Sequence, residues 1–151
     1  MPIIKNLKQH KLLLDTHVWL WIMIGNSDLT ANFRKAFAHS QKNQGVLISP
    51  ISIWEIGMLV EKNRIQIDMD VQEWVDQALD IPGVKLSPIT SRIAIQSSRL
   101  PGIVHGDPAD RLLIATAHEE NAVLTTCDEK LLKYGADKFV NVHDPSKNFL
   151  P

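Results

Sequence analysis

Acidic residues in this sequence follow short apolar runs closely. Asp15 comes directly after Leu12-Leu13-Leu14, and Asp128 comes two residues after the apolar run 123–126. If these runs are parallel strands, their carboxyl ends meet at one edge of a sheet, where open α/β proteins bind their ligands. Carboxylate oxygens are the ligands that Mg²⁺ prefers. The spacing therefore predicts that both acids lie in one ligand site.

Two more acids extend this set. Glu55 interrupts the apolar segment 53–59, and a carboxylate buried among such neighbours is costly unless a metal ion or polar group compensates it. Asp110 lies in the first turn of a helix that we expect to begin at Pro108. Asp107 has the position of an N-cap, so we assign Asp107 mainly to capping and Asp110 mainly to metal chemistry.

Carboxylates gathered in this way repel one another, and each resists ionisation unless a cation compensates the charge. Four of them can hold one divalent ion, or two ions about 3.5–4 Å apart, and the residues leave this choice open. Such a site lowers the pKa of a bound water and stabilises charge on a departing oxygen. These residue types therefore predict metal-dependent hydrolysis of phosphodiester bonds.

The elements that must position these acids alternate along the chain as short apolar runs and longer amphipathic segments. Strands separated by helices indicate parallel pairing, because a parallel neighbour needs a long crossover. We expect one domain, residues 1–151, with an α/β fold in which helices flank a central parallel sheet of undetermined strand order. The predicted strands are 11–14, 45–49, 84–88, 122–126 and 139–142. The predicted helices are 18–24, 31–39, 53–62, 71–79, 93–100, 108–120 and 129–134.

Composition bounds the class of protein. Hydrophobic residues make up 44% of the 151 residues and charged residues 22%, which is typical of a globular domain. The net charge of −1 does not indicate a globally basic nucleic-acid binder, so phosphate binding must come from a local patch or bound metal. The single cysteine, Cys127, cannot form an internal disulfide, and no apolar run approaches the roughly 20 residues of a membrane span. We therefore expect a cytoplasmic protein without membrane segments.

Four short segments carry the acids, in one order along the chain: Leu13-Leu14-Asp15-Thr16-His17, Ser52-Ile53-Trp54-Glu55-Ile56, Asp107-Pro108-Ala109-Asp110-Arg111-Leu112-Leu113-Ile114-Ala115 and Thr125-Thr126-Cys127-Asp128. Together they resemble the PIN domain, and within it the VapC-type toxins of bacterial toxin–antitoxin pairs. No single segment would be decisive, since a strand that ends in Asp is common. The resemblance extends over nearly the whole chain.

This resemblance implies an acidic quartet at Asp15, Glu55, Asp110 and Asp128, accompanied by the hydroxyl of Thr126. Asp15 and Asp110 would be direct or water-mediated ligands of Mg²⁺ or Mn²⁺, while Glu55 and Asp128 complete the site or orient the attacking water. The implied function is an endoribonuclease that acts as the toxin of a type II pair. An antitoxin of the VapB kind would silence it, and a homodimer is the expected assembly.

Two cations and a histidine lie close to the acids in sequence. Arg64 follows the Glu55 segment and Arg111 adjoins Asp110, so both are candidates for contacts with RNA phosphates, which cations position without reading sequence. His17 lies two residues beyond Asp15 and either reaches the scissile phosphate or orients a neighbour by hydrogen bonding.

Three tryptophans, Trp19, Trp21 and Trp54, have the flat surface on which single-stranded bases stack. They also occur at helical spacing among aliphatic residues, which favours a place in the core or at a dimer interface. We favour the second interpretation for all three.

Two other functions compete with the nuclease. A degenerate PIN-like module for binding or assembly would be expected to lose one or more acids, and here all four are present. A phosphoacceptor signalling domain would need an acid at the end of its third strand, and the run 84–88 ends without one. The nuclease is therefore the function that the sequence favours.

Overall fold

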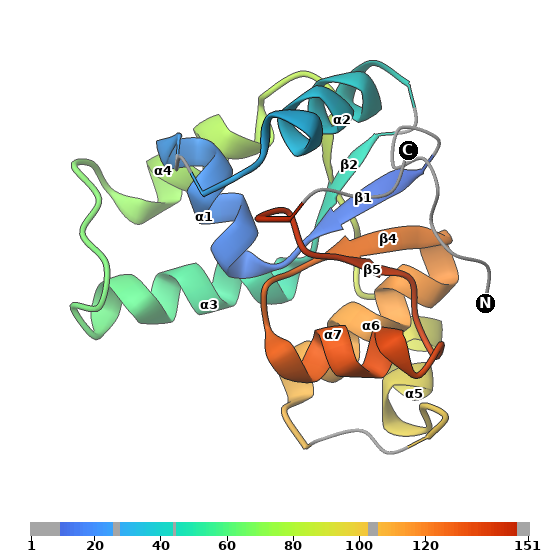
Figure 1. The fold of residues 1–151 in the computed structure, drawn as a ribbon. Helices are drawn as coiled ribbons and strands as arrows, with labels where there is room; N and C mark the ends of the chain where they lie inside the picture. The colour runs from blue at the N-terminus through green and yellow to red at the C-terminus, as the bar shows by residue number, and fades with distance from the viewer. Residues whose placement is uncertain (1–9, 26–27, 44, 103–105, 148–151) are drawn as a thin grey trace.

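The computed structural model describes residues 10–25, 28–43, 45–102 and 106–147. Over these residues strands and helices alternate, and all the strands belong to one parallel sheet with the order β3-β2-β1-β4-β5 (Figure 1). The strands are β1 (Lys11–Leu14), β2 (Val46–Ile48), β3 (Val84–Leu86), β4 (Ala122–Thr125) and β5 (Val142–His143). The helices are α1 (Thr16–Ile24), α2 (Ala31–Lys42), α3 (Pro50–Glu61), α4 (Val71–Leu79), α5 (Ser91–Ser98), α6 (Pro108–Glu120) and α7 (Glu129–Ala136). None of the described helices is long and apolar enough to cross a membrane.

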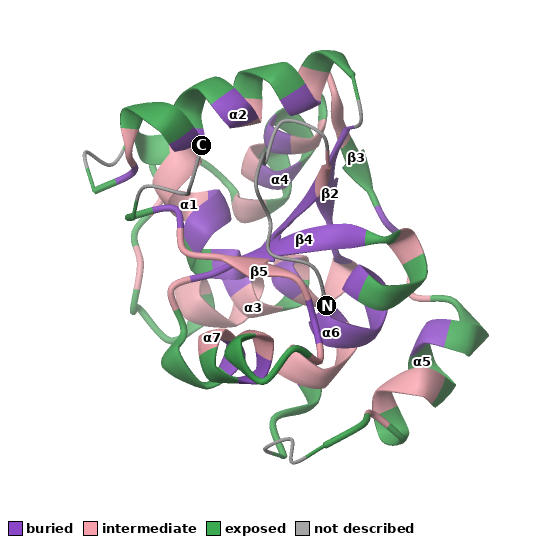
Figure 2. Ribbon diagram, turned by 45° about the vertical axis from the view of Figure 1, so that its right-hand side comes forward, coloured by how far each residue is buried: buried purple, intermediate pink, exposed green. Residues whose placement is uncertain are grey.

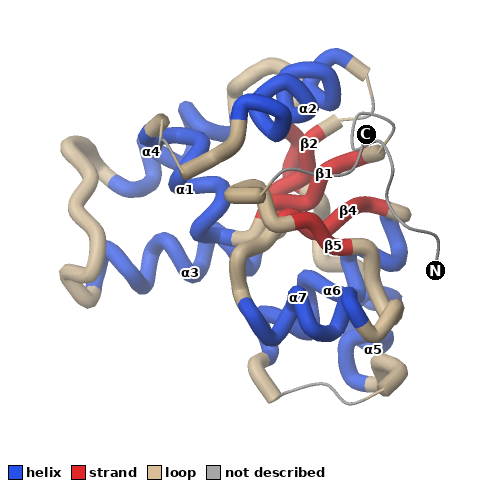
Figure 3. The backbone as a smooth tube through the Cα atoms, in the orientation of Figure 1, coloured by secondary structure: helices blue, strands red, loops and turns tan. Residues whose placement is uncertain are grey.

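The sheet lies between two layers of helices, so that both of its faces are covered (Figure 1, Figure 3). Side chains alternate between the faces of a strand, and β1 uses both. Leu12 and Leu14 pack in the core with α1, α2 and α4, whereas Leu13 packs in a second core with α6 and α7. Figure 2 shows β4, which lies between the central strand β1 and the edge strand β5, as buried along its length. The predicted fold, a parallel sheet flanked by helices, is confirmed.

Capping residues explain where the helices that matter for the site begin. Asp15 caps α1, which therefore starts at Thr16, two residues before the predicted start. Ser49 accepts a hydrogen bond from the amide of Ile51 at 3.2 Å, so that α3 starts three residues earlier than predicted. The predicted bounds of α4 and α6 are confirmed.

The last strand was wrongly predicted at 139–142, since β5 comprises only Val142–His143. The aromatic ring of Phe139 is instead stacked on Tyr134 of α7, with the ring centroids 5.1 Å apart. Hydrogen bonding to β4 begins at Asn141, whose carbonyl accepts from the amide of Leu124 at 2.9 Å. The start of the apolar run therefore packs on α7, and only its end pairs with β4.

Candidate active site

The site begins where the neighbouring strands β1 and β4 end. Asp15 follows β1 directly, and its amide donates to the carbonyl of Thr125 at 3.0 Å, which extends the pairing of β1 with β4. Thr126, the next residue beyond β4, donates its hydroxyl to Oδ2 of Asp15 at 2.7 Å. The predicted meeting of the two strand ends is thus present, with Asp15 and Thr126 in direct contact.

Asp15 has hydrogen bonds at both carboxylate oxygens. Oδ1 accepts from the amide of Thr16 at 2.7 Å as the N-cap of α1, while Oδ2 accepts from Thr126. Burial raises the pKa of Asp15, and the two hydrogen bonds lower it by a smaller amount. The nearby charge of Asp128 raises it further, while His17 lowers it. The result is a carboxyl group with a pKa above its usual value.

Glu55 reaches the same edge from α3. Its Oε1 accepts a hydrogen bond from the hydroxyl of Thr16 at 2.8 Å. Burial raises the pKa of Glu55, and the charges of Asp15 and Asp107 add to this effect against the hydrogen bond from Thr16. We expected a compensating polar group beside this acid, and Thr16 provides one.

Asp110 lies half-buried in the first turn of α6. Asp107 caps this helix through a 2.9 Å hydrogen bond from the amide of Ala109, so its predicted capping role is confirmed, while the assignment of Asp110 to metal chemistry stays a prediction. Burial raises the pKa of Asp110 to about 7, together with the negative charges of Asp107, Asp15, Asp128 and Glu55. Each of the other acids therefore acts on Asp110 electrostatically.

Asp128 completes the set as the N-cap of α7. Its Oδ1 accepts from the amides of Lys130 at 2.8 Å and Leu131 at 3.1 Å, and its own amide donates to the hydroxyl of Thr126 at 3.0 Å. Thr126 thus connects the segments that carry Asp15 and Asp128. We call the four carboxylates and this hydroxyl the acidic edge: Asp15, Glu55, Asp110, Thr126 and Asp128.

The chemistry of the acidic edge fits a hard divalent cation. Its donors are all oxygens, and burial together with the neighbouring negative charges raises the pKa of Asp110. In the described parts of the chain, no three His, Cys, Asp or Glu side chains are arranged to hold a metal ion by themselves. Mg²⁺ is commonly held by only one or two carboxylates, with water and substrate phosphate completing its shell. The donor set therefore suits such an ion without a preformed cage.

The sequence did not single out Thr16. This residue is 1% exposed and contacts both Asp15 and Glu55. The signal available was its position, a hydroxyl residue directly after the first acid and at the start of a helix. Its contact with an acid 39 residues away depends on how α1 and α3 pack.

The two arginines proposed for RNA contacts lie in different settings. Arg111 is partly buried, and its Nε donates to the carbonyl of Ser97 at 2.8 Å, which ties the end of α5 to the start of α6. Arg64 is exposed beyond the far end of α3, a helix that leads away from the sheet (Figure 1). A role of either residue in binding RNA stays a prediction.

The tryptophans divide into two groups. Trp19 is buried and packs on Trp74 with the ring centroids 5.3 Å apart, and Trp21 packs against the same core. Trp54 is 59% exposed on α3, next to Glu55 in sequence. The predicted place in the core is therefore wrong for this residue. A dimer contact or a stacked base remains a prediction for Trp54.

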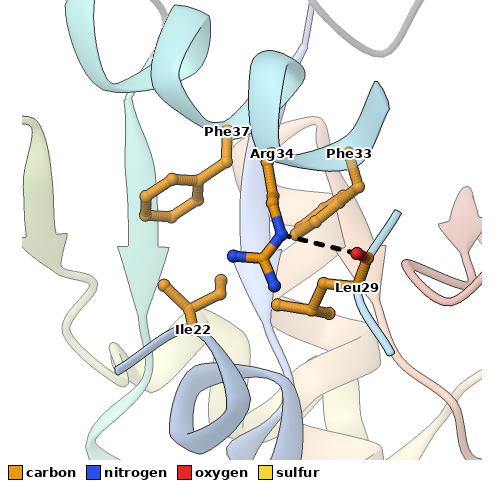
Figure 4. A pocket seen from close by; sticks show the side chains of 5 residues that line it. All are labelled: Ile22, Leu29, Phe33, Arg34 and Phe37. Carbon is orange, nitrogen blue, oxygen red and sulfur yellow. Dashed lines mark hydrogen bonds between the residues drawn. The ribbon is translucent and has the colours of Figure 1, made fainter. Parts of the chain in front are cut away.

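A second surface feature lies between α1 and α2, away from the acids. A pocket of about 160 Å³ is lined mainly by apolar side chains, and Figure 4 shows the guanidinium group of Arg34 beside them. An adjoining pocket of about 170 Å³ shares Ile22 and Phe37 with it and extends to α4. We call the two together the apolar pockets. The first is lined by Ile22, Leu29, Phe33, Arg34 and Phe37.

Comparison with known sequences identifies two similarities. The sequence profile of the PIN domain matches residues 12–137. Ribonuclease VapC22 of Mycobacterium tuberculosis is 33% identical over 130 residues, which cover 86% of this chain and 96% of that protein. The matched residues include the whole acidic edge.

Solved structures with the same fold include two complexes. VapBC2 from Rickettsia felis, bound to a DNA fragment from its promoter, superposes with a TM-score of 0.65 at 19% identity over 87% of this chain and 96% of that one. FitAcB from Neisseria gonorrhoeae gives a TM-score of 0.59 at 19% identity over 89% and 97% of the two chains. At these identities the likeness establishes the fold.

Proposed function

Because the chain belongs to the PIN domain family and, within it, to the VapC-type ribonucleases, we propose that it is a metal-dependent endoribonuclease and a type II toxin. The observation that carries the proposal is the gathering of four carboxylates at one edge of the sheet, where burial and then the charges of Asp107, Asp15, Asp128 and Glu55 raise the pKa of Asp110 to about 7. A pure binding module has no need to gather like charges at such a cost.

In this proposal Asp15 and Asp110 are the main ligands of Mg²⁺ or Mn²⁺. Bound there, the ion would supply an activated water and neutralise charge on the phosphate. Burial, with the charges of Asp15 and Asp107, raises the pKa of Glu55 above its usual value, which makes it a stronger base toward the attacking water. Thr126 holds the carboxylate of Asp15 in orientation, and Asp128 adds a carboxylate at the same edge.

Cleavage of RNA tests this proposal. The purified protein would be incubated with a mixed pool of cellular RNAs in Mg²⁺, in Mn²⁺ and in chelator, beside Asp15→Asn and Asp110→Asn. We expect discrete fragments that require the metal and that disappear in both variants. Full activity of both variants, with the same cleavage sites, would rule out the acidic edge as the catalytic site.

The RNA itself needs cationic partners. Besides Arg64 and Arg111 we propose Arg92 and Arg99, which line an open hollow on α5. Arg92 is largely exposed despite its 3.6 Å contact with Glu119. The bond between Arg111 and α5 places the end of that helix beside the first turn of α6, which also carries Asp110. An RNA strand that leaves the acidic edge along α5 would therefore pass these side chains.

A protein partner follows from the same family membership. Two further solved structures of this fold are a toxin–antitoxin complex from Klebsiella pneumoniae and DNA-bound VapBC from Salmonella typhimurium. We propose that this chain likewise binds an antitoxin of the VapB kind, whose apolar side chains enter the apolar pockets. We also propose a homodimer, for which exposed Trp54 is a candidate contact. Substitution Trp54→Glu would then shift the protein to monomer in sedimentation experiments.

A further inference from the structure

Thr16 makes two contacts that together connect two acids of the acidic edge. Its backbone amide donates to Oδ1 of Asp15 at 2.7 Å, and its hydroxyl donates to Oε1 of Glu55 at 2.8 Å. The first contact is within one turn of chain, whereas the second joins α1 to α3. One buried residue thus fixes the separation of carboxylates that come from different elements.

The hydroxyl of Thr16 is used differently from that of an ordinary helical threonine. Thr116 in α6 shows the common pattern, since its Oγ1 donates to the carbonyl of Leu112 one turn earlier in the same helix at 2.8 Å. Thr16 is the first residue of α1, and its single hydroxyl proton goes to a carboxylate of another helix. Both threonines are fully buried, so burial does not distinguish them.

Glu55 needs such a partner because its surroundings oppose a fixed, charged carboxylate. Burial and the charges of Asp15 and Asp107 disfavour the ionised form, while the hydrogen bond from Thr16 favours it. A glutamate side chain also has three rotatable bonds, and a hydrogen bond to one oxygen limits their freedom. The hydrogen bond from Thr16 therefore limits the orientations of this acid.

We propose that Thr16 is a positioning residue for RNA cleavage: its hydroxyl holds Glu55 at a set distance from Asp15, in the orientation that receives the metal and the attacking water. The proposal rests on the function proposed above. It requires no contact between Thr16 and the RNA, and it acts through preorganisation of the carboxylates before the substrate binds.

Three variants separate this role from a merely structural one. Thr16→Val keeps the shape and removes the hydroxyl, Thr16→Ser keeps the hydroxyl, and Thr116→Val removes an equally buried hydroxyl from α6. We expect Thr16→Val to lower kcat by about 10- to 100-fold, the usual effect of losing a residue that orients a ligand. The KM for RNA should change little. Thr16→Ser should restore most of kcat, and Thr116→Val should leave it unchanged.

Two measurements do not depend on cleavage. Calorimetric titration with Mn²⁺ should show weaker binding by about tenfold in Thr16→Val but not in Thr116→Val. In chelator, urea unfolding of Thr16→Val, Glu55→Leu and the double variant should give non-additive changes, because each single change removes either the donor or the acceptor of the hydrogen bond.

Equal kcat and equal Mn²⁺ affinity in Thr16→Val and Thr116→Val would overturn the positioning role, as would additive unfolding changes. A kcat in Thr16→Ser as low as in Thr16→Val would also overturn it. If the wild-type protein cleaves no RNA, the proposed nuclease function fails, and the Mn²⁺ and unfolding measurements still decide whether Thr16 positions Glu55.

Discussion

The two ends of α1 contrast in their physical chemistry. At its start, Asp15 belongs to the acidic edge and Thr16 contacts it, and burial and like charges raise the pKa values of three carboxyl groups there. At its last turn, Ile22 and Met23 line the apolar pockets together with Phe37 of α2. One end gathers charge at the expense of stability, and the other keeps apolar surface available beside the core.

The two ends of α1 therefore affect the stability of the protein in different ways. Folding brings carboxylates together only because packing elsewhere compensates, so the acidic edge should become more stable when its charge is neutralised. The apolar pockets should behave in the opposite way, because removal of apolar atoms there weakens packing. Variants at the acidic edge should therefore lower activity and raise stability. Variants at the apolar pockets should lower stability and leave activity nearly unchanged.

The largest expected effect is on activity at the acidic edge. Asp110→Asn removes a proposed metal ligand, and we expect RNA cleavage to fall by roughly 10²–10³-fold or more, as when a group that stabilises transition-state charge is lost. In chelator the same variant should unfold at higher urea concentration than wild type, because a repelled charge is gone. Lower stability in chelator would break the contrast between the two ends of α1.

Stability should also depend on pH in a direction set by these acids. The pKa of Asp110 is about 7 in the folded protein, against 3.8 for an unperturbed aspartate side chain, so the folded state binds more protons between these values. The free energy of unfolding in chelator should therefore fall as pH rises from about 4 to 7, and the raised pKa values of Asp15 and Glu55 act in the same direction.

Urea unfolding at several pH values measures this dependence. Saturating Mg²⁺ should reduce the loss of stability at pH 7–8, because the ion compensates the ionised carboxylates. Asp110→Asn should make the dependence shallower. A slope equal in wild type and Asp110→Asn would contradict the raised pKa.

At the other end of α1, Phe37→Ala should show the reverse combination. Phe37 is partly buried, so we expect a loss of about 2 kcal/mol in the free energy of unfolding, below the 3–5 kcal/mol typical of fully buried phenylalanine. Cleavage of RNA should stay within about twofold of wild type, while affinity for the antitoxin should fall. A change in Mn²⁺ affinity would show that the two ends are coupled.

The smallest expected effect is at α5. Replacing Arg92 and Arg99 with alanine should weaken RNA binding and leave kcat unchanged, because these side chains lie outside the acidic edge. The dependence of binding on salt should become shallower by roughly 0.7 for each lost phosphate contact. Lys42→Ala, at an exposed position at the end of α2, is the control that should not change this slope.

Much of the fold was predictable because local signals agreed with the tertiary structure. Asp107 and Pro108 mark the start of α6, and the structure begins the helix there. The run 11–14 was predicted correctly as β1 because its residues pack on both faces of the sheet. β5 was misplaced because Phe139 packs on α7 and hydrogen bonding to β4 begins only at Asn141, which periodicity does not reveal.

For the site, residue types predicted which acids lie together but not how they are held. Strand ends brought Asp15 and Asp128 to one edge, as expected from parallel pairing. The bond from Thr16 to Glu55 depends on the packing of α1 on α3, which no local pattern encodes. Trp54 was assigned to the core or to a dimer interface because its neighbours are apolar, and its exposure on α3 leaves only the interface.

Calorimetric titration of Mn²⁺ into chelator-treated protein tests the central claim most directly, which is that the acidic edge needs a cation. At pH 7 we predict binding with release of a proton from Asp110, so that the measured heat depends on the ionisation enthalpy of the buffer. The buffer dependence should disappear above pH 8 and in Asp110→Asn. Absence of Mn²⁺ binding to the folded wild-type protein would contradict the claim.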